Sequence, residues 1–248
     1  MSSKPEGVNY SLLTPHCLLF CEGCLYKEYR ITIVIPCLNE EEGIKKVLAE
    51  VPPLVDEVIV VDNNSTDRTG QVAQEMQAKV IFEQERGYGR AYKTGLFQAQ
   101  GDIILTLDGD HSYPINAIAN LLDSLIDQKI DFLSASRFPI KRKGAMSFKH
   151  YIGNKLLSLT MSLLYGQWIR DSQSGMWVFR KEVLSRMKLE SNGMAFSEEI
   201  KIEAIINKDI KFKEVPIDYS QRAGEAKLKP WKDGFKNILF LFRKRFFR

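Results

Sequence analysis

The sequence predicts an α/β protein whose single domain is built on a doubly wound, mostly parallel sheet. Three observations carry this prediction. Continuous apolar, β-branched runs alternate with segments of helical character, which is typical of parallel strands joined by right-handed crossovers. Polar side chains directly follow several of these runs, at the edge where such sheets bind ligands. At 248 residues with 44% hydrophobic content, the chain can bury one large core.

The first half of the sheet is assigned from four apolar runs. Ile31–Pro36 (ITIVIP) and Glu57–Asp62 (EVIVVD) are typical of strands buried on both faces. Two shorter runs, at 79–83 and 102–108, follow the same pattern. Helices are expected between the strands, and Ser65 or Thr66 can cap the second of them. Their expected ranges are 39–51, 63–76 and 86–100.

Past residue 114 the alternation continues, with a basic loop and a longer helix. Pro216 interrupts the last apolar segment, which therefore favours an edge strand at 209–219. The other expected elements are a helix at Ile115–Ile126, a strand at Asp131–Ser136, a long helix at Phe148–Tyr165, a short segment at 174–184 and a helix at Phe196–Asn207.

Three polar strand ends are expected to meet in one crevice: Asn39–Glu40, Asp62–Asn64 and Asp108–Asp110. Asp108 and Asp110 would repel each other unless a cation lay between them. Hard Mg²⁺ or Mn²⁺ prefers oxygen ligands and shares its shell with phosphates. The alternative is an Asp-Gly turn in which the second aspartate caps the next helix. The neighbouring polar ends favour a metal–phosphate site.

The sequence does not support a phosphate-loop ATPase, a dinucleotide-binding enzyme or a cysteine nucleophile. There is no GxxxxGK[ST] phosphate loop and no GxGxxG after the first strand, and Cys37 lacks a histidine partner in a matching position. The net charge of +4 is mild and favours an anionic surface or a phosphorylated ligand over nucleic acid. The longest apolar run, Ile238–Phe242, is far below the roughly 20 residues that a membrane span needs.

Cys17, Cys21 and Cys24 lie in a segment, residues 1–28, that is expected to be an N-terminal extension. Their C-x3-C-x2-C spacing is compatible with an iron–sulfur cluster or with reduced thiols in an irregular segment. Short cysteine spacings alone favour the second interpretation.

Seven motifs in order resemble the family 2 glycosyltransferases of the GT-A fold, closest to the branch of dolichyl- and polyprenyl-phosphate sugar transferases. They are VIPCLNEEEGI, VVDNNSTDRT, RGYGRAYKTG, LTLDGDHSYP, SRF, RDSQSGMWVFRK and EVPIDYSQRAGEAKL. The resemblance runs from Tyr29 to the C-terminus and implies a nucleotide-sugar half and an acceptor half within one domain, residues 29–230. It implies an inverting hexosyltransferase that acts on GDP-mannose or a UDP-hexose.

The resemblance also implies roles for individual residues. Asp108 and Asp110, with Gly109 between them, would form the motif that binds Mg²⁺ or Mn²⁺. The nucleobase and ribose would lie against Pro36, Asn39, Glu40, Asp62 and Asn64. The donor and acceptor phosphates would be bound by Arg137, Arg222 and Lys227, and the residues expected to be catalytic are Asp110, Arg222 and Lys227.

Two positions depart from the family pattern, and three more remain open. Asn63 stands where a second aspartate is common, and GEAK (224–227) stands where Gly-x-Ser-Lys is common. Asp171 either positions the acceptor or caps a turn. Glu198 and Glu199 either assist a hydroxyl acceptor or lie on a solvated helix face. A lipid phosphate loses its second proton near pH 6 and needs little help from a base.

The C-terminal segment 231–248 is expected to form a basic amphipathic helix. Its apolar stripe consists of Trp231, Phe235, Ile238, Phe242 and Phe246, with Lys232, Lys236, Arg243 and Arg245 between them. Such a helix either packs on the domain or lies in a membrane interface, and the terminal RKRFFR favours the membrane. We therefore expect peripheral attachment to the cytoplasmic membrane face, with a membrane protein as one candidate partner.

Two rival functions remain open. The first is a family 2 enzyme that uses a soluble or glycan hydroxyl as its acceptor. The second is a non-catalytic nucleotide-binding or interaction protein on the same fold. The paired carboxylates of Asp108 and Asp110 count against the second rival, because an idle site has no need for adjacent like charges.

Overall fold

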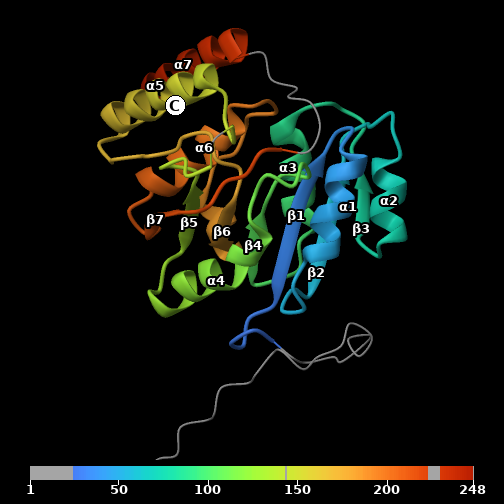
Figure 1. Ribbon diagram of the computed structural model, residues 1–248. Helices are drawn as coiled ribbons and strands as arrows, with labels where there is room; N and C mark the ends of the chain where they lie inside the picture. The colour runs from blue at the N-terminus through green and yellow to red at the C-terminus, as the bar shows by residue number, and fades with distance from the viewer. Residues whose placement is uncertain (1–24, 143, 223–229, 248) are drawn as a thin grey trace, which may run out of the picture.

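The computed structural model describes residues 25–142, 144–222 and 230–247, without the side chains of 230–233. A seven-stranded sheet in the order β3-β2-β1-β4-β6-β5-β7 runs through the molecule, with helices on both faces (Figure 1). The doubly wound, mostly parallel architecture predicted from the sequence is therefore confirmed.

The first half of the sheet is parallel throughout. Strand β1 lies at its centre, pairs with β2 and β4, and is buried along its length except at Pro36. The elements are β1 (Ile31–Cys37), α1 (Glu41–Glu50), β2 (Glu57–Asp62), α2 (Thr69–Glu75), β3 (Lys79–Phe82), α3 (Tyr88–Gln98) and β4 (Ile103–Thr106).

The second half contains one reversed strand, β6, which is antiparallel to both β4 and β5. Strand β7 lies at the sheet edge and ends at Pro216, as the sequence predicts. The elements are η2 (Ile115–Ala117), α4 (Ile118–Asp127), β5 (Phe132–Ser136), α5 (Phe148–Tyr165), β6 (Trp177–Arg180), η3 (Lys181–Arg186), α6 (Phe196–Ile206), β7 (Phe212–Pro216) and α7 (Pro230–Phe246).

One helix start differs from its prediction. Helix α2 begins at Thr69, after Arg68, whose side chain makes no capping hydrogen bond, and the Thr69 amide donates to Asp67 Oδ1 at 3.0 Å. The Ser65 hydroxyl accepts a hydrogen bond from the Asn39 amide at 2.9 Å, and the Thr66 amide donates to Asn39 Oδ1 at 2.7 Å. The capping prediction for Ser65 and Thr66 was wrong because these residues join the loop after β2 to the loop after β1.

Three layers of side chains organise the core. Helices α1, α2 and α4 pack on one face of the sheet, for example through Ile44 and Leu122. Helices α3 and α6 pack on the other face, where Tyr92 stacks on Phe196 with ring centroids 5.6 Å apart. Helices α5 and α7 form an outer layer on α6, with Leu241 buried against it (Figure 1).

Of the expected extension 1–28, only residues 25–28 are described. The Tyr26 hydroxyl donates to Asp123 of α4 at 2.6 Å, and Lys27 forms ion pairs with Asp123 and Asp127 at 2.7 and 2.9 Å. Cys17, Cys21 and Cys24 lie outside the described residues. None of the helices within the described ranges is long and apolar enough to cross a membrane.

Candidate active site at the strand ends

The tip after β4 carries Asp108, Gly109 and Asp110. Asp110 is almost fully buried. A Cβ atom on Gly109 would lie 2.4 Å from the Sγ atom of Cys37, so a larger residue would push the tip away from the end of β1. Cys37 is buried, forms no disulfide within the described residues, and packs under this tip. The carboxyl ends of the two central strands therefore meet here, as expected for a parallel sheet.

Asp108 lies under two phenol groups from α3. The hydroxyls of Tyr88 and Tyr92 lie 3.2 and 3.4 Å from Asp108 Oδ1. Burial, and next the negative charge of Asp110, raise the pKa of Asp108 to about 7. The like-charge repulsion foreseen in the sequence is therefore present in the fold, and a cation at this point would relieve it.

Asp110 is held from two sides. Its Oδ1 atom accepts a hydrogen bond from the Ser112 amide at 3.0 Å and another from the Ser112 hydroxyl. Its Oδ2 atom faces the Nε atom of Arg222 at 3.5 Å, and the Nη2 atom of Arg222 donates to Glu40 at 2.8 Å. The structure thus brings Glu40, Asp110 and Arg222 together from segments that are far apart in the sequence.

The loops after β1 and β2 form the neighbouring wall. Asp62 Oδ1 accepts from the Ser65 amide at 3.0 Å, which ties this carboxylate to the loop that contacts Asn39. Asn39 and Asn64 both adopt positive φ angles, of 52° and 63°, which asparagine tolerates better than most residues. Pro36 lies within β1, opposite Val61 of β2.

Asn63 explains one departure from the family pattern. Its side-chain amide donates to the carbonyls of Glu83 and Glu85 at 3.2 and 2.7 Å, and its Oδ1 atom accepts from the Gly87 amide at 2.7 Å. An aspartate could not make the two donations. Asn63 is therefore used to hold the segment between β3 and α3. Asn64 likewise donates to the Gln84 carbonyl at 3.1 Å.

Arg137 follows β5 and is paired with the fully buried Asp171. Its Nε and Nη2 atoms each donate to this carboxylate at 2.8 Å, and its backbone amide donates at 2.9 Å. These contacts, led by the charge of Arg137, hold the pKa of Asp171 well below its usual range despite its burial. The guanidinium also lies 5.3 Å from the ring centroid of Tyr219. Asp171 thus positions Arg137 and is not merely a turn cap.

The segment that leads into β6 packs against Asp108 and forms one wall of the site. A Cβ atom on Gly175 would lie 2.4 Å from the Tyr88 hydroxyl and 3.0 Å from Asp108 Oδ1. The Tyr113 hydroxyl accepts from the Gly175 amide at 2.7 Å. Because β6 runs antiparallel, this segment starts a strand at the edge where the neighbouring strands end. Glycine is needed at 175 because no side chain fits there.

Glu198 and Glu199 do not lie on a solvated helix face, so that interpretation was wrong. Both are buried because α5 and α7 cover α6. Glu199 accepts from the Glu190 and Ser191 amides at 3.0 and 2.8 Å and pairs with Lys244 at 3.0 Å, which is a structural role. Glu198 accepts from Gln173 at 2.7 Å, and burial raises its pKa to about 8.

The residues at the tip fit a divalent cation that is shared with a ligand. Within the described ranges, no group of three or more histidine, cysteine or acidic side chains is placed to hold a metal by itself. Mg²⁺ is commonly bound through one or two carboxylates, with phosphates and water completing its shell. Asp108 and Asp110 would supply two such carboxylates, and the raised pKa of Asp108 is consistent with a negative charge that no cation balances.

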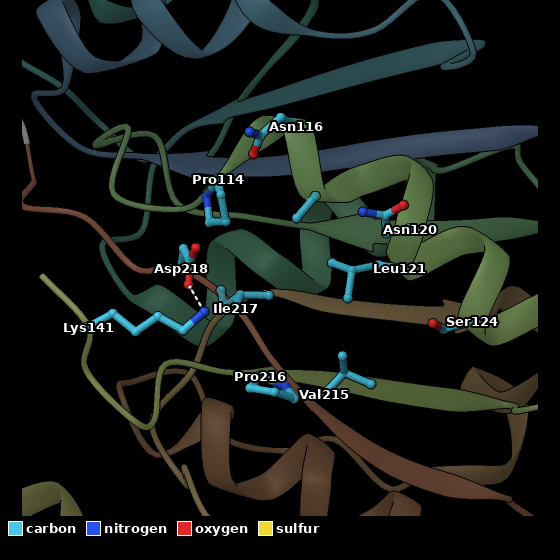
Figure 2. Close-up of a pocket in the computed structure, with 11 residues that line it drawn as sticks. Pro114, Asn116, Asn120, Leu121, Ser124, Lys141, Val215, Pro216, Ile217 and Asp218 are labelled. Carbon is cyan, nitrogen blue, oxygen red and sulfur yellow. Dashed lines mark ion pairs between the residues drawn. The ribbon is translucent and has the colours of Figure 1, made fainter.

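A separate groove lies outside the residues of this site. It has a volume of about 320 Å³ and runs between the start of α4 and the end of β7, where Lys141 and Asp218 form an ion pair of 2.6 Å (Figure 2). None of the predicted site residues lines it. The candidate active site is therefore defined by the strand ends and not by this groove.

Sequence reasoning missed several residues of the site. Tyr88 and Tyr92 are four residues apart in RGYGRAYKTG, a spacing that places both phenols on one face of a helix, and this was the available signal. Ser112 and Gly175 gave no signal in the sequence. Lys227 was predicted to be catalytic, and it lies outside the described residues.

Comparison with known proteins identifies the family. Residues 32–187 match the family described as glycosyl transferase family 2. The low-salt glycan biosynthesis hexosyltransferase Agl6 of Haloferax volcanii is 34% identical over 85% of this chain, which spans about half of that relative's length (52%). A dolichyl-phosphate hexose transferase of the same organism is 34% identical over 82% of this chain and 89% of its own length. The dolichol-phosphate mannosyltransferase of Pyrococcus furiosus is 29% identical, over 86% of this chain and 63% of its own.

Solved structures establish the fold. Glucosyl-3-phosphoglycerate synthase from Mycobacterium tuberculosis, in complex with Mn²⁺, UDP and glucosyl-3-phosphoglycerate, superposes with a TM-score of 0.70. The identity is 20%, and the match covers 88% of this chain and 80% of the synthase chain. The same synthase with Mn²⁺, UDP and phosphoglyceric acid gives a TM-score of 0.72 at 21% identity, over 88% of this chain and 79% of the other. The chain belongs to glycosyltransferase family 2, and its domain has the GT-A fold.

Proposed function

We propose that this protein transfers a hexosyl unit from a nucleotide sugar to a polyprenyl or dolichyl phosphate, with inversion at the anomeric carbon. The observation that carries the proposal is the pair Asp108 and Asp110, which lies at the strand ends beside Arg222. Relatives named as transferases acting on dolichyl or dolichol phosphate support the acceptor. A fold neighbour that binds Mn²⁺ with UDP supports the nucleotide and the metal.

Asp108 and Asp110 would hold Mg²⁺ or Mn²⁺, which supplies a Lewis acid for the departing nucleoside diphosphate. An oxygen of the acceptor phosphate attacks C1 of the hexose, and the bond from C1 to the diphosphate breaks. The electron pair leaves with the diphosphate, and no proton has to move. Arg222 and Lys227 would add positive charge for the diphosphate, as would Arg137 for the acceptor phosphate. Pro36, Asn39, Glu40, Asp62 and Asn64 would bind the nucleoside.

The rival with a hydroxyl acceptor needs a general base, and Glu198 and Glu199 were the candidates for that role. Its raised pKa of about 8 keeps Glu198 protonated near neutral pH, and a protonated carboxyl cannot accept the hydroxyl's proton. Glu199 is already paired with Lys244. These contacts favour an acceptor that arrives ionised, such as a lipid phosphate.

A lipid-linked acceptor would place the reaction at a membrane. The proposal therefore includes peripheral attachment to the cytoplasmic membrane face. A membrane protein remains one candidate partner there. The basic residues of α7, Lys236, Arg243 and Arg245, support the attachment by their charge and exposure.

The first experiment is a thermal-shift panel with GDP-mannose, UDP-glucose and UDP-N-acetylglucosamine, each with and without Mn²⁺. At about 100 times its Kd, a bound donor stabilises the fold by about 2.7 kcal/mol, or roughly 5–10 °C in a domain of this size. We expect one nucleotide class to stabilise the protein, more strongly with metal, and Asp110→Ala to abolish the metal-dependent part.

Transfer to a polyprenyl phosphate is then measured with the stabilising donor. Stabilisation by a nucleotide sugar without transfer to any acceptor would favour the non-catalytic nucleotide-binding protein. Transfer only to a hydroxyl group would favour the family 2 enzyme with a soluble or glycan hydroxyl acceptor. No stabilisation by any nucleotide sugar would contradict the proposal.

A further inference from the structure

The outer faces of α5 and α7 carry most of the exposed large apolar side chains of the described structure. Fifteen such side chains are exposed; six of them lie on α5 and four on α7. On α5, five residues recur at helical spacing, and at about 100° per residue they fall within an arc of about 80°. These residues are Phe148, Ile152, Leu156, Leu159 and Leu163.

Helix α7 presents a second stripe of the same kind. Its exposed apolar residues fall within an arc of about 60° at the same helical periodicity. They are Phe235, Leu239, Phe242 and Phe246. Ile238, which the sequence placed in the apolar stripe, instead packs beside Leu241 in the cluster between the helices. Trp231 and Lys232 are outside the described side chains. The stripe therefore differs from the predicted one by the exchange of Ile238 for Leu239.

The two stripes form one surface, which we call the α5–α7 face and define by the nine residues above. The buried sides of both helices contact the same cluster, which contains Leu157, Met161, Ile202 and Leu241. The helices lie side by side at one end of the molecule, outside α6 (Figure 1). Their exposed sides are opposite that cluster and so face away from the domain. Contiguous apolar surfaces of this kind mark interaction sites in soluble proteins.

The charge on this face indicates its partner. Helix α5 contains no acidic residue, and Lys149 lies exposed beside its stripe. Lys236 and Arg243 lie exposed beside the stripe of α7, and neither has a carboxylate ion pair within the described residues. Apolar and aromatic side chains flanked by basic groups suit the interface of a bilayer with anionic headgroups.

A chain of contacts joins this face to the candidate active site. The inner side of α5 carries Asn154, whose amide donates to Asp171 Oδ1 at 2.9 Å. The same carboxylate holds Arg137. A helix is about 10–12 Å across, so a bilayer on the outer side of α5 would lie roughly one helix diameter from the contacts of Arg137. A lipid phosphate could reach that arginine without the whole lipid leaving the membrane.

We infer that the α5–α7 face docks on an anionic bilayer surface, and that α5 contributes to the contact as much as the C-terminal helix does. The inference rests on the proposed function only for the identity of the acceptor. Membrane binding itself requires neither donor nor catalysis, so the two can be tested separately.

The test is co-sedimentation of the full chain with vesicles of phosphatidylcholine alone and with about one third phosphatidylglycerol, without nucleotide sugar. The variant Leu156→Glu/Leu163→Glu places charges in the α5 stripe. Its matched control is Phe97→Glu, at an 87% exposed phenylalanine on α3.

The variant Lys236→Ala/Arg243→Ala removes two positive charges beside the α5–α7 face. Its control is Lys45→Ala/Lys46→Ala, at two exposed lysines on α1. Circular dichroism confirms that each variant is folded.

We expect binding to the anionic vesicles. The Lys236→Ala/Arg243→Ala variant should bind at least tenfold more weakly, since each surface cation contributes about fivefold. The Leu156→Glu/Leu163→Glu variant should lose at least tenfold as well, because it replaces two apolar contacts with the bilayer by carboxylates that anionic headgroups repel. Both controls should bind like the wild type. The Leu156→Glu/Leu163→Glu variant should still transfer hexose to a short, water-soluble prenyl phosphate while losing transfer to a vesicle-embedded acceptor.

Failure of the wild type to bind vesicles would overturn the inference, as would equal loss in the controls. Self-association that Leu156→Glu/Leu163→Glu abolishes, without vesicle binding, would assign the face to a second copy and would also overturn it. Vesicle binding without transfer to either acceptor would leave the inference standing and contradict the proposed function.

Discussion

The two halves of the sheet place their polar groups in different ways. In the first half, residues 31–110, polar side chains follow the strand ends directly, and loops bind one another through asparagine and serine. In the second half, Arg137, Asp171 and Lys201 are charged groups held inside the protein by partners from distant segments; for example, Lys201 donates to the Asp171 carbonyl at 2.8 Å. The first half therefore presents its chemistry at strand ends, whereas the second half assembles it in the interior.

The largest expected effect tests the buried pair. Asp171→Asn leaves Arg137 without its buried carboxylate, and we expect a loss of about 3–5 kcal/mol in the free energy of unfolding. Urea denaturation measures it. Asp127→Asn, at an exposed carboxylate on α4, should cost less than about 1 kcal/mol. Equal losses of unfolding free energy in Asp171→Asn and Asp127→Asn would contradict this comparison, because the buried charges of the second half would then contribute no more stability than an exposed carboxylate.

The next effect belongs to the first half and should appear in activity, not in stability. Asp110→Asn is expected to reduce hexose transfer by roughly 10²–10³-fold, because under the proposed function it removes a ligand of the metal ion that stabilises the leaving diphosphate. Its melting temperature without ligand should stay level or rise, because the repulsion of Asp108 is removed. A transfer assay and a thermal melt check the two results. Asp209→Asn, on an exposed loop after α6, is the control. A variant that unfolds would point to a structural carboxylate.

This contrast explains what the sequence could reveal. The position of Asp108 and Asp110 at the end of β4 was predictable because the strand and the two carboxylates are contiguous in the sequence. Helix α6 was placed correctly, but the burial of Glu198 and Glu199 was not, because Lys244 and the covering helices come from elsewhere in the chain. The antiparallel direction of β6 was also missing from the prediction, since a short apolar run has the same pattern in either direction.

A smaller effect concerns pH. The folded protein binds the Glu198 proton more tightly than the unfolded chain does, because burial raises the pKa from 4.5 to about 8. The stability contributed by this proton is complete below the ordinary glutamate pKa and is lost as the pH rises toward 8. Between about pH 5 and pH 8, the wild type should lose roughly 2–4 kcal/mol relative to Glu198→Gln.

Urea denaturation at three pH values in this window measures that difference. The window ends near pH 8 because burial lowers the pKa of Lys201 to about 8, so its titration adds an opposite slope above that pH. Parallel pH profiles for the wild type and the variant would contradict the assignment of a protonated Glu198.

The smallest effect lies at the surface. Lys27→Met removes ion pairs with Asp123 and Asp127, in which the lysine is 40% exposed, so we expect a loss of less than about 1 kcal/mol. The loss should shrink further in about 1 M salt, because exposed pairs are screened. Chemical denaturation at low and high salt measures it. A loss as large as that of Asp171→Asn would mean that residues 25–28 are part of the core.

The reversed strand β6 has a consequence for biosynthesis. Strand β4 pairs with β1 on one side, but its other partner, β6, begins at Trp177, 71 residues beyond Thr106. At about 5–20 residues per second, the ribosome needs roughly 4–14 s to make that interval. During this time the outer edge of β4 has unpaired backbone hydrogen-bonding groups. Strand β5 also lacks β6, which is its partner in the folded sheet. Translation speed across residues 107–177 is therefore expected to govern how much of the newly made chain escapes aggregation.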